Sequence, residues 1–198
     1  MTKKVILLFA LCMVYTFLRY VYFGPKSPEN IPLYLMNKAV SMGSVIALLM
    51  AAISYYKKEG LLTRDWGKVS LHSAFLHVFM SFPLITPEYY AVFYGHADHG
   101  KMDHVGELVL LFGTLAAYFY YMVHKSKPGS NHMRVLKICA SCLVAAHIFE
   151  LGAGGWLNVA GWHGSLPPIT LITTIAALAA MALYTITPAP ETLSGRSG

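Results

Sequence analysis

Charged residues are scarce in this chain. Only 12% of its 198 residues are Asp, Glu, Lys or Arg, whereas 56% are hydrophobic. Soluble domains carry about 25% charged residues. A water-soluble domain of this size cannot bury so much apolar surface in a single core. A helical bundle in lipid can, because lipid replaces water around its outer face. The composition therefore predicts an all-α integral membrane protein.

Acidic residues are the rarest charges. There are 9 of them against 15 Lys and Arg, which gives a net charge of +6. A basic chain can indicate a nucleic-acid partner. In a chain this apolar, the excess is better explained by Lys and Arg gathered on the cytoplasmic side of a membrane, so lipid is the expected partner and nucleic acid is not.

Cysteine is also scarce, and the three thiols all fall in apolar stretches. This excludes a disulfide framework. Cys139 and Cys142 have the C-x-x-C spacing of redox and metal motifs, but they lie in the middle of an apolar segment. We interpret them as small packing residues. No Gly-rich dinucleotide motif follows a strand pattern, so the chain is predicted to lack its own flavin or nicotinamide domain.

Long hydrophobic runs are abundant instead. Each is close to the roughly 20 residues that a helix needs to cross a bilayer. The first has the basic start of a signal peptide but no small-x-small cleavage site, so we interpret it as a span. We expect one domain over residues 1–187, a flexible tail over 188–198, and a charged loop over 57–68. The six spans are predicted at residues 4–22, 33–56, 69–85, 105–124, 133–151 and 169–187.

The basic residues predict the orientation of these spans. If the N-terminus is cytoplasmic, eleven of the fifteen Lys and Arg residues lie on the inner side, as the positive-inside rule requires. Both termini are then cytoplasmic, in a membrane of the bacterial inner-membrane type. The inner residues are Lys3, Lys4, Lys57, Lys58, Arg64, Lys68, Lys125, Lys127, Arg134, Lys137 and Arg196; the outer ones are Arg19, Lys26, Lys38 and Lys101.

Two histidines lie inside predicted spans. Ionisable residues there are costly, so each is a functional candidate. His77 has small neighbours on its helical face, namely Ser73, Ala74 and Ser81, which leaves room for a flat macrocycle. His147 is its counterpart on the fifth span. Neutral imidazoles on two facing helices are suitable axial ligands of a haem b iron.

The depths of these two histidines agree only in part. Counted from the inner ends of their predicted spans, His77 lies about 12 Å deep and His147 about 20 Å deep. Helix tilt, together with an error of a few residues in the span boundaries, could close the difference. Two alternatives stay open: each histidine could simply bond a neighbouring helix, or the macrocycle could be a chlorophyll.

A second histidine cluster lies in the longest polar segment. His96, His99 and His104 alternate there with Asp98 and Asp103, which are ligand types for Zn or Cu. Histidine-rich tracts are also common as solvated loops. Because this loop is predicted to face outwards, it could instead meet a partner protein.

Four charged residues are expected near the outer interface: Arg19, Lys38, Glu107 and Glu150. They could form an ion-paired cluster. Arg19 or Lys38 could also hold the propionates of a haem. The alternative is that both cations extend to the interface without a specific partner.

Several stretches resemble a known family. LHSAFLHVFMSFPLITPEYY, GELVLLFGTLAAYFYY and LVAAHIFELGAGGWLNVAGWHGSLPPITLI are similar to the ferric reductase-like transmembrane family, which includes the haem subunit of the bacterial methionine-sulfoxide reductase system. The resemblance covers about residues 33–183. It implies a six-helix bundle that carries b-type haem and passes electrons between a quinol or flavin donor and an acceptor. His77 and His147 match the haem-ligating histidines.

The family's second histidine pair is missing here. Members with two haems carry another histidine about four turns along each helix, where this chain has Thr63, Ala91, Met133 and Gly161. His72, His124, His132 and His163 lie near the span ends, so one haem is expected. We therefore predict a ferric reductase-like electron-transfer cytochrome that is supplied by quinone or by a separate flavoprotein. The alternatives are a non-catalytic subunit of a larger membrane complex and a metal or proton transporter.

Overall fold

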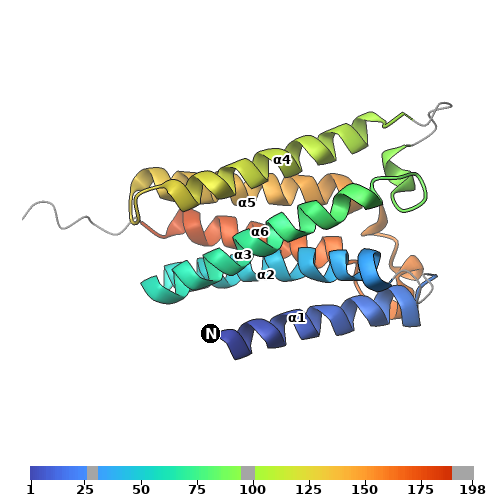
Figure 1. The fold of residues 1–198 in the computed structure, drawn as a ribbon, viewed down its shortest axis with the longest axis horizontal. Helices are drawn as coiled ribbons and strands as arrows, with labels where there is room; N and C mark the ends of the chain where they lie inside the picture. Colours follow the sequence, from blue (N-terminus) through green and yellow to red (C-terminus); the bar gives the residue numbers. More distant parts are fainter. Residues whose placement is uncertain (26–30, 95–100, 189–198) are drawn as a thin grey trace, which may run out of the picture.

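Six long helices form one up-and-down bundle, in which consecutive helices run in opposite directions (Figure 1). The computed structural model describes residues 1–25, 31–94 and 101–188, and within them it has helices and no strand. This confirms the all-α prediction. The helices are α1 (Thr2–Phe17), α2 (Met36–Tyr56), α3 (Gly60–Ser81), α4 (His104–Lys125), α5 (Asn131–Gly152) and α6 (Ile169–Ile186).

The two ends of the bundle differ. At one end the connections α2–α3 and α4–α5 are short and rich in lysine; we call this the basic end. At the other end, the long-loop end, the connections are longer and contain single helical turns. These turns are the π-helical Leu18–Tyr22 and Ile31–Leu35 and the 3-10 turns Phe82–Leu84, Ala91–Phe93, Ala153–Gly155, Val159–Gly161 and His163–Ser165.

Side-chain caps define where two helices begin. Asp103 Oδ1 accepts hydrogen bonds from the backbone N–H groups of Val105 (3.0 Å) and Gly106 (3.1 Å). Ser130 Oγ accepts one from Met133 (3.1 Å). Each cap satisfies N–H groups that the first turn of a helix leaves without a partner. The caps therefore fix the starts of α4 and α5.

The charged segment 57–68 is not the loop that the sequence suggested. Only Lys57–Glu59 connects the helices, with Lys58 at φ 61°, and α3 begins at Gly60. The prediction of a loop was wrong: it rested on the charged residues of this segment, whereas the packing of Trp66 decides its structure. Trp66 is only 4% exposed and packs on Ala47 and Ala51 of α2, and this contact keeps the charged turns helical.

Within the described residues, five helical segments are long and apolar enough to cross a membrane, which is the pattern of a multi-pass membrane protein. They are Thr2–Tyr22, Leu33–Tyr56, His104–Lys125, Asn131–Gly155 and His163–Ile186. Helix α3 has the length but not the hydropathy, since its first turns carry Arg64, Asp65 and Lys68.

Helix α2 lies at the centre of the bundle and packs against α1, α3 and α6. Its contact with α6 is made of small residues: Ala52 and Ala180 are among the most buried side chains. Small residues let helix backbones approach closely, which is how helices associate in lipid. Helix α5 in turn joins α6 to α4, whereas α3 contacts α4 at only a few positions.

A polar contact ties α3 to this centre. Ser44 Oγ donates to the carbonyl oxygen of Ser70 (3.1 Å), and Ser70 Oγ donates to that of Ser44 (2.9 Å). Because the single Ser70 proton is thus used, the Tyr120 hydroxyl of α4, 3.0 Å away, must donate to Ser70 Oγ. One buried serine therefore links α2, α3 and α4.

Replacing this serine tests the contact. We expect Ser70→Ala to lower the free energy of unfolding by about 1–2 kcal/mol, since it removes two interhelical bonds and strands the Tyr120 hydroxyl. The matched control is Ser141→Ala, because Ser141 is equally buried but bonds only the Lys137 carbonyl of its own helix. Denaturant titration of both proteins in detergent measures the difference. Equal losses in the two variants would contradict the prediction.

Candidate functional site

His77 and His147 lie at the same level of the bundle. His77 is four residues before the end of α3, and His147 is five residues before the end of α5. Both helices run towards the long-loop end, so each histidine is about 6–8 Å from that end at 1.5 Å per residue. The difference in depth counted from the sequence came from the boundary of the third span, because α3 begins nine residues earlier than predicted.

Asn37 of α2 holds the imidazole of His77. Its Oδ1 is 2.6 Å from His77 Nδ1, and its Nδ2 donates to Ser81 Oγ (3.1 Å). Ser81 Oγ in turn donates to the carbonyl oxygen of His77 (2.8 Å). Since Nδ2 is a donor, Oδ1 must be the acceptor, and His77 Nδ1 therefore carries the proton. Asn37 is completely buried, so this network is fixed within the bundle.

A backbone carbonyl of α4 holds the imidazole of His147. His147 Nδ1 is 2.7 Å from the carbonyl oxygen of Val109. A carbonyl only accepts, so Nδ1 again carries the proton. Gly113, one turn further along α4, makes this approach possible: a Cβ on it would lie 2.9 Å from His147 Nδ1 and 3.1 Å from Cε1.

The two imidazoles are thus in the same chemical state. In each, Nδ1–H is bonded to oxygen, and among the described residues Nε2 has no hydrogen-bond partner. A neutral imidazole in this tautomer presents the Nε2 lone pair, which is the form in which histidine binds metals. Both helices therefore bring an imidazole in this state towards the long-loop end of the bundle.

Lys38 is the cation beside this pair. It directly follows Asn37, the residue that holds His77, on α2. Its ammonium lies over the rings of Tyr34 (5.3 Å) and Tyr90 (4.7 Å), which are cation–π contacts. The site therefore combines two metal-binding lone pairs with one positive charge.

Arg19 also lies at the long-loop end, but its side chain contacts the segment before α6 and not the histidine network. Its guanidinium donates to the Leu166 carbonyl and lies 5.6 Å from the Tyr20 ring. Its buried Nε has no hydrogen-bond partner within the described chain. The expected ion-paired cluster of Arg19, Lys38, Glu107 and Glu150 does not form: the described residues contain one ion pair, between Arg64 and Asp65.

The small residues predicted around His77 have different roles. Ser81 belongs to the His77 network. Ser73 is buried but donates to the Val69 and Ser70 carbonyls of its own helix, and Ala74 is half-buried beside it. Only Ser81 is therefore tied to the imidazole by hydrogen bonds.

The predicted outer-loop metal site falls mostly outside the described residues. His96 and His99 lie in the segment 95–100, which the structure does not describe, and His104 is an exposed residue at the start of α4. Across ranges 1–25, 31–94 and 101–188, no group of three or more His, Cys, Asp or Glu residues is arranged for a metal ion. Cys12, Cys139 and Cys142 are free thiols.

Two residues that matter here were missed by the sequence analysis. Asn37 was a weak signal, as an amide inside the otherwise apolar span 33–56. Gly113 was another, as a glycine in the middle of the span 105–124. Both signals were present, but neither the partner helix nor the partner side chain can be read from one sequence.

No protein-family model matches this sequence, and no curated protein is detectably similar to it. The comparisons therefore assign no function to this site. The evidence for its function is the geometry of the two imidazoles and of the residues around them.

A methyl group at Gly113 tests the close packing of the His147 imidazole against α4. Gly113→Ala must displace the imidazole and its bond to Val109, so we expect it to destabilise the protein by about 1–2 kcal/mol. Gly67→Ala is the matched control, because it lies inside α3 with open space around it and should stabilise by about 0.5–1 kcal/mol. Thermal unfolding in detergent compares the two. A Gly113→Ala protein as stable as Gly67→Ala would contradict the geometry.

Proposed function

We propose that this protein is a membrane-embedded b-type cytochrome, with one haem held between α3 and α5 by His77 and His147. The observation that carries the proposal is the shared state of the two imidazoles: Nδ1–H bonded to oxygen and Nε2 without a partner in the described structure. This donor set would suit a haem iron held by two histidine nitrogens. When bound, the haem would supply reversible one-electron reduction of its iron.

The protein's own residues would orient and tune that group. Asn37 and the Val109 carbonyl fix the ring orientations of His77 and His147 and raise the basicity of the ligating nitrogens. Gly113 leaves room for the ring on α4. Lys38 would pair with a propionate or favour the reduced iron through its charge. Electrons would come from a quinol or a separate flavoprotein.

The proposal includes six spans, with α3 as the sixth, and both termini in the cytoplasm. The distribution of charge supports it: the basic end collects the lysines of the short connections, as the positive-inside rule requires. Arg64 and Lys68 lie in the first turns of α3, at that end, and would reach the interface. The histidine pair is then in the outer half of the membrane, of the bacterial inner-membrane type, close to an acceptor on the outer face.

A reduced-minus-oxidised absorption spectrum of the purified protein tests the haem. We expect a b-type signal that disappears in His77→Ala and in His147→Ala, because each loses an axial ligand. His72→Ala is the control, since His72 is exposed on the same helix and should keep the full signal. A colourless wild-type protein, expressed with ample haem, would refute the cytochrome. A haem that neither quinol nor dithionite reduces would indicate a purely structural role.

The charge of Lys38 should set the redox potential. Its positive charge favours the reduced iron, so we expect Lys38→Met to lower the midpoint potential by roughly tens of millivolts, the size of one unit charge acting through a protein interior. Lys101→Met, at an exposed position, is the control. Potentiometric titration of both variants measures the shift. An unchanged potential in Lys38→Met would show that the ammonium does not act on the haem.

A further inference from the structure

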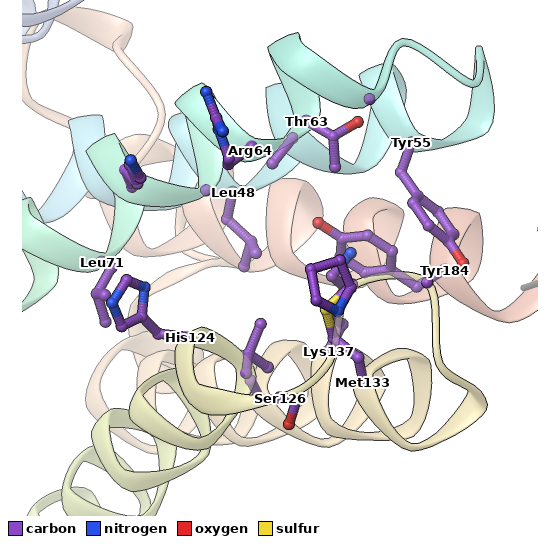
Figure 2. A pocket seen from close by; sticks show the side chains of 18 of the residues that line it. Leu48, Tyr55, Thr63, Arg64, Leu71, His124, Ser126, Met133, Lys137 and Tyr184 are labelled. Carbon is purple, nitrogen blue, oxygen red and sulfur yellow. The ribbon is translucent and has the colours of Figure 1, made fainter. Parts of the chain in front are cut away.

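A large cleft opens at the basic end, away from the histidine pair. Its volume is about 1090 Å³. Figure 2 shows α3 on one side, with Thr63, Arg64 and Leu71, and the facing ends of α4 and α5 on the other, with His124, Ser126 and Met133. The cleft exists because α3 packs along α2 and barely touches α4. Helices α2 and α6 contribute Leu48, Tyr55 and Tyr184 to its wall.

The charged residues that line this cleft within the described chain are all basic. Across residues 1–25, 31–94 and 101–188, the lining includes no Asp or Glu. Two acidic residues adjoin the lining in sequence: Glu59, between Lys58 and Gly60, and Asp65, which pairs with Arg64 at 3.9 Å on an exposed surface. The cationic or potentially cationic side chains come from three helices and a connection: Lys58, Arg64, Lys68, His124 and Lys137. Such a lining attracts an anion and disfavours a cation.

Lys137 is a largely buried cation of this lining. It is only 8% exposed, and its ammonium lies 4.3 Å from the Tyr55 ring and 5.3 Å from the Tyr184 ring. Among the described residues it has neither a carboxylate nor a hydrogen-bond acceptor. Cation–π contacts offset part of the cost of burying an ammonium, but a buried charge is normally paired as well.

Apolar side chains make up much of the remaining lining. Leu48, Leu71, Val123 and Ala140 continue the cleft into the bundle. A free phosphate would leave these side chains uncovered. The volume, about 1090 Å³, also slightly exceeds the roughly 300–1,000 Å³ typical of small-molecule pockets. The occupant that matches both parts is large and amphipathic, with an anionic group at one end and hydrocarbon at the other.

We propose that this cleft binds one acidic phospholipid from the leaflet at the basic end. Its phosphate pairs with Lys137 and Lys68, and its acyl chain lies along Leu48 and Leu71. Basic pockets between membrane helices on the cytoplasmic side recognise acidic headgroups in this way. The lipid fills the gap between α3 and α4 and so fixes α3 against the rest of the bundle. This proposal needs membrane insertion but not the haem.

Native mass spectrometry of the full-length protein tests it. The protein is reconstituted in an equimolar mixture of phosphatidylglycerol and phosphatidylcholine and then released with bound lipid. We expect one retained phosphatidylglycerol, with affinity lower by about fivefold in Lys137→Gln, the value of one lysine–lipid contact. Lys68→Gln, an exposed position on α3, should show a similar loss and covers the case in which Lys137→Gln does not fold.

Lys125→Gln is the matched control. Lys125 is exposed at the end of α4 and does not line the cleft, so its replacement removes the same charge from the same end and should leave lipid retention unchanged. Equal losses of phosphatidylglycerol affinity in Lys125→Gln and Lys68→Gln would show that general surface charge holds the lipid, and would overturn the proposed site. Inorganic phosphate that displaces the lipid, or raises the melting temperature as much as phosphatidylglycerol does, would instead assign the cleft to small anions. Equal retention of both lipids would also overturn it.

Discussion

Hydrogen bonds between α2 and α3 are the interaction on which the rest of this bundle depends. Helix α3 is too polar to be held among apolar helices by its surface alone, since hydrocarbon offers no hydrophobic drive between helices. Instead, Ser44 and Ser70 bond reciprocally at one level, and Asn37 bonds His77 and Ser81 at another. These contacts fix the rotation of α3, and with it the direction in which His77 points.

The same requirement explains the state of the histidines. A buried imidazole N–H needs an acceptor, and the bundle supplies two different ones: an amide oxygen on α2 and a backbone carbonyl on α4. Both choices consume Nδ1 and leave Nε2. Each Nδ1 bond already joins two helices, so the proposed ligand role rests on Nε2, which has no hydrogen-bond partner among the described residues.

Most of the helices could be predicted from the sequence, because apolar runs of about 20 residues are a strong signal in membrane proteins. The start of α3 could not, since it depends on Trp66 packing against α2, a contact between residues distant in sequence. The candidate ligands His77 and His147 were also visible, as ionisable residues in apolar spans. The residues that hold these imidazoles could not be predicted, because Asn37, Val109 and Gly113 contact them from other helices.

The polarity of α3 connects the two sites. Near the long-loop end, α3 presents an imidazole, and near the basic end it presents Arg64 and Lys68 beside an apolar cleft. Since α3 contacts α4 at few positions, its placement relative to α5 rests mainly on α2 and on whatever occupies the cleft. A lipid bound there would restrain the basic end of α3, and the haem that we propose between His77 and His147 would restrain the other end. The geometry of the histidine pair would then depend on the composition of the surrounding leaflet, through one rigid helix.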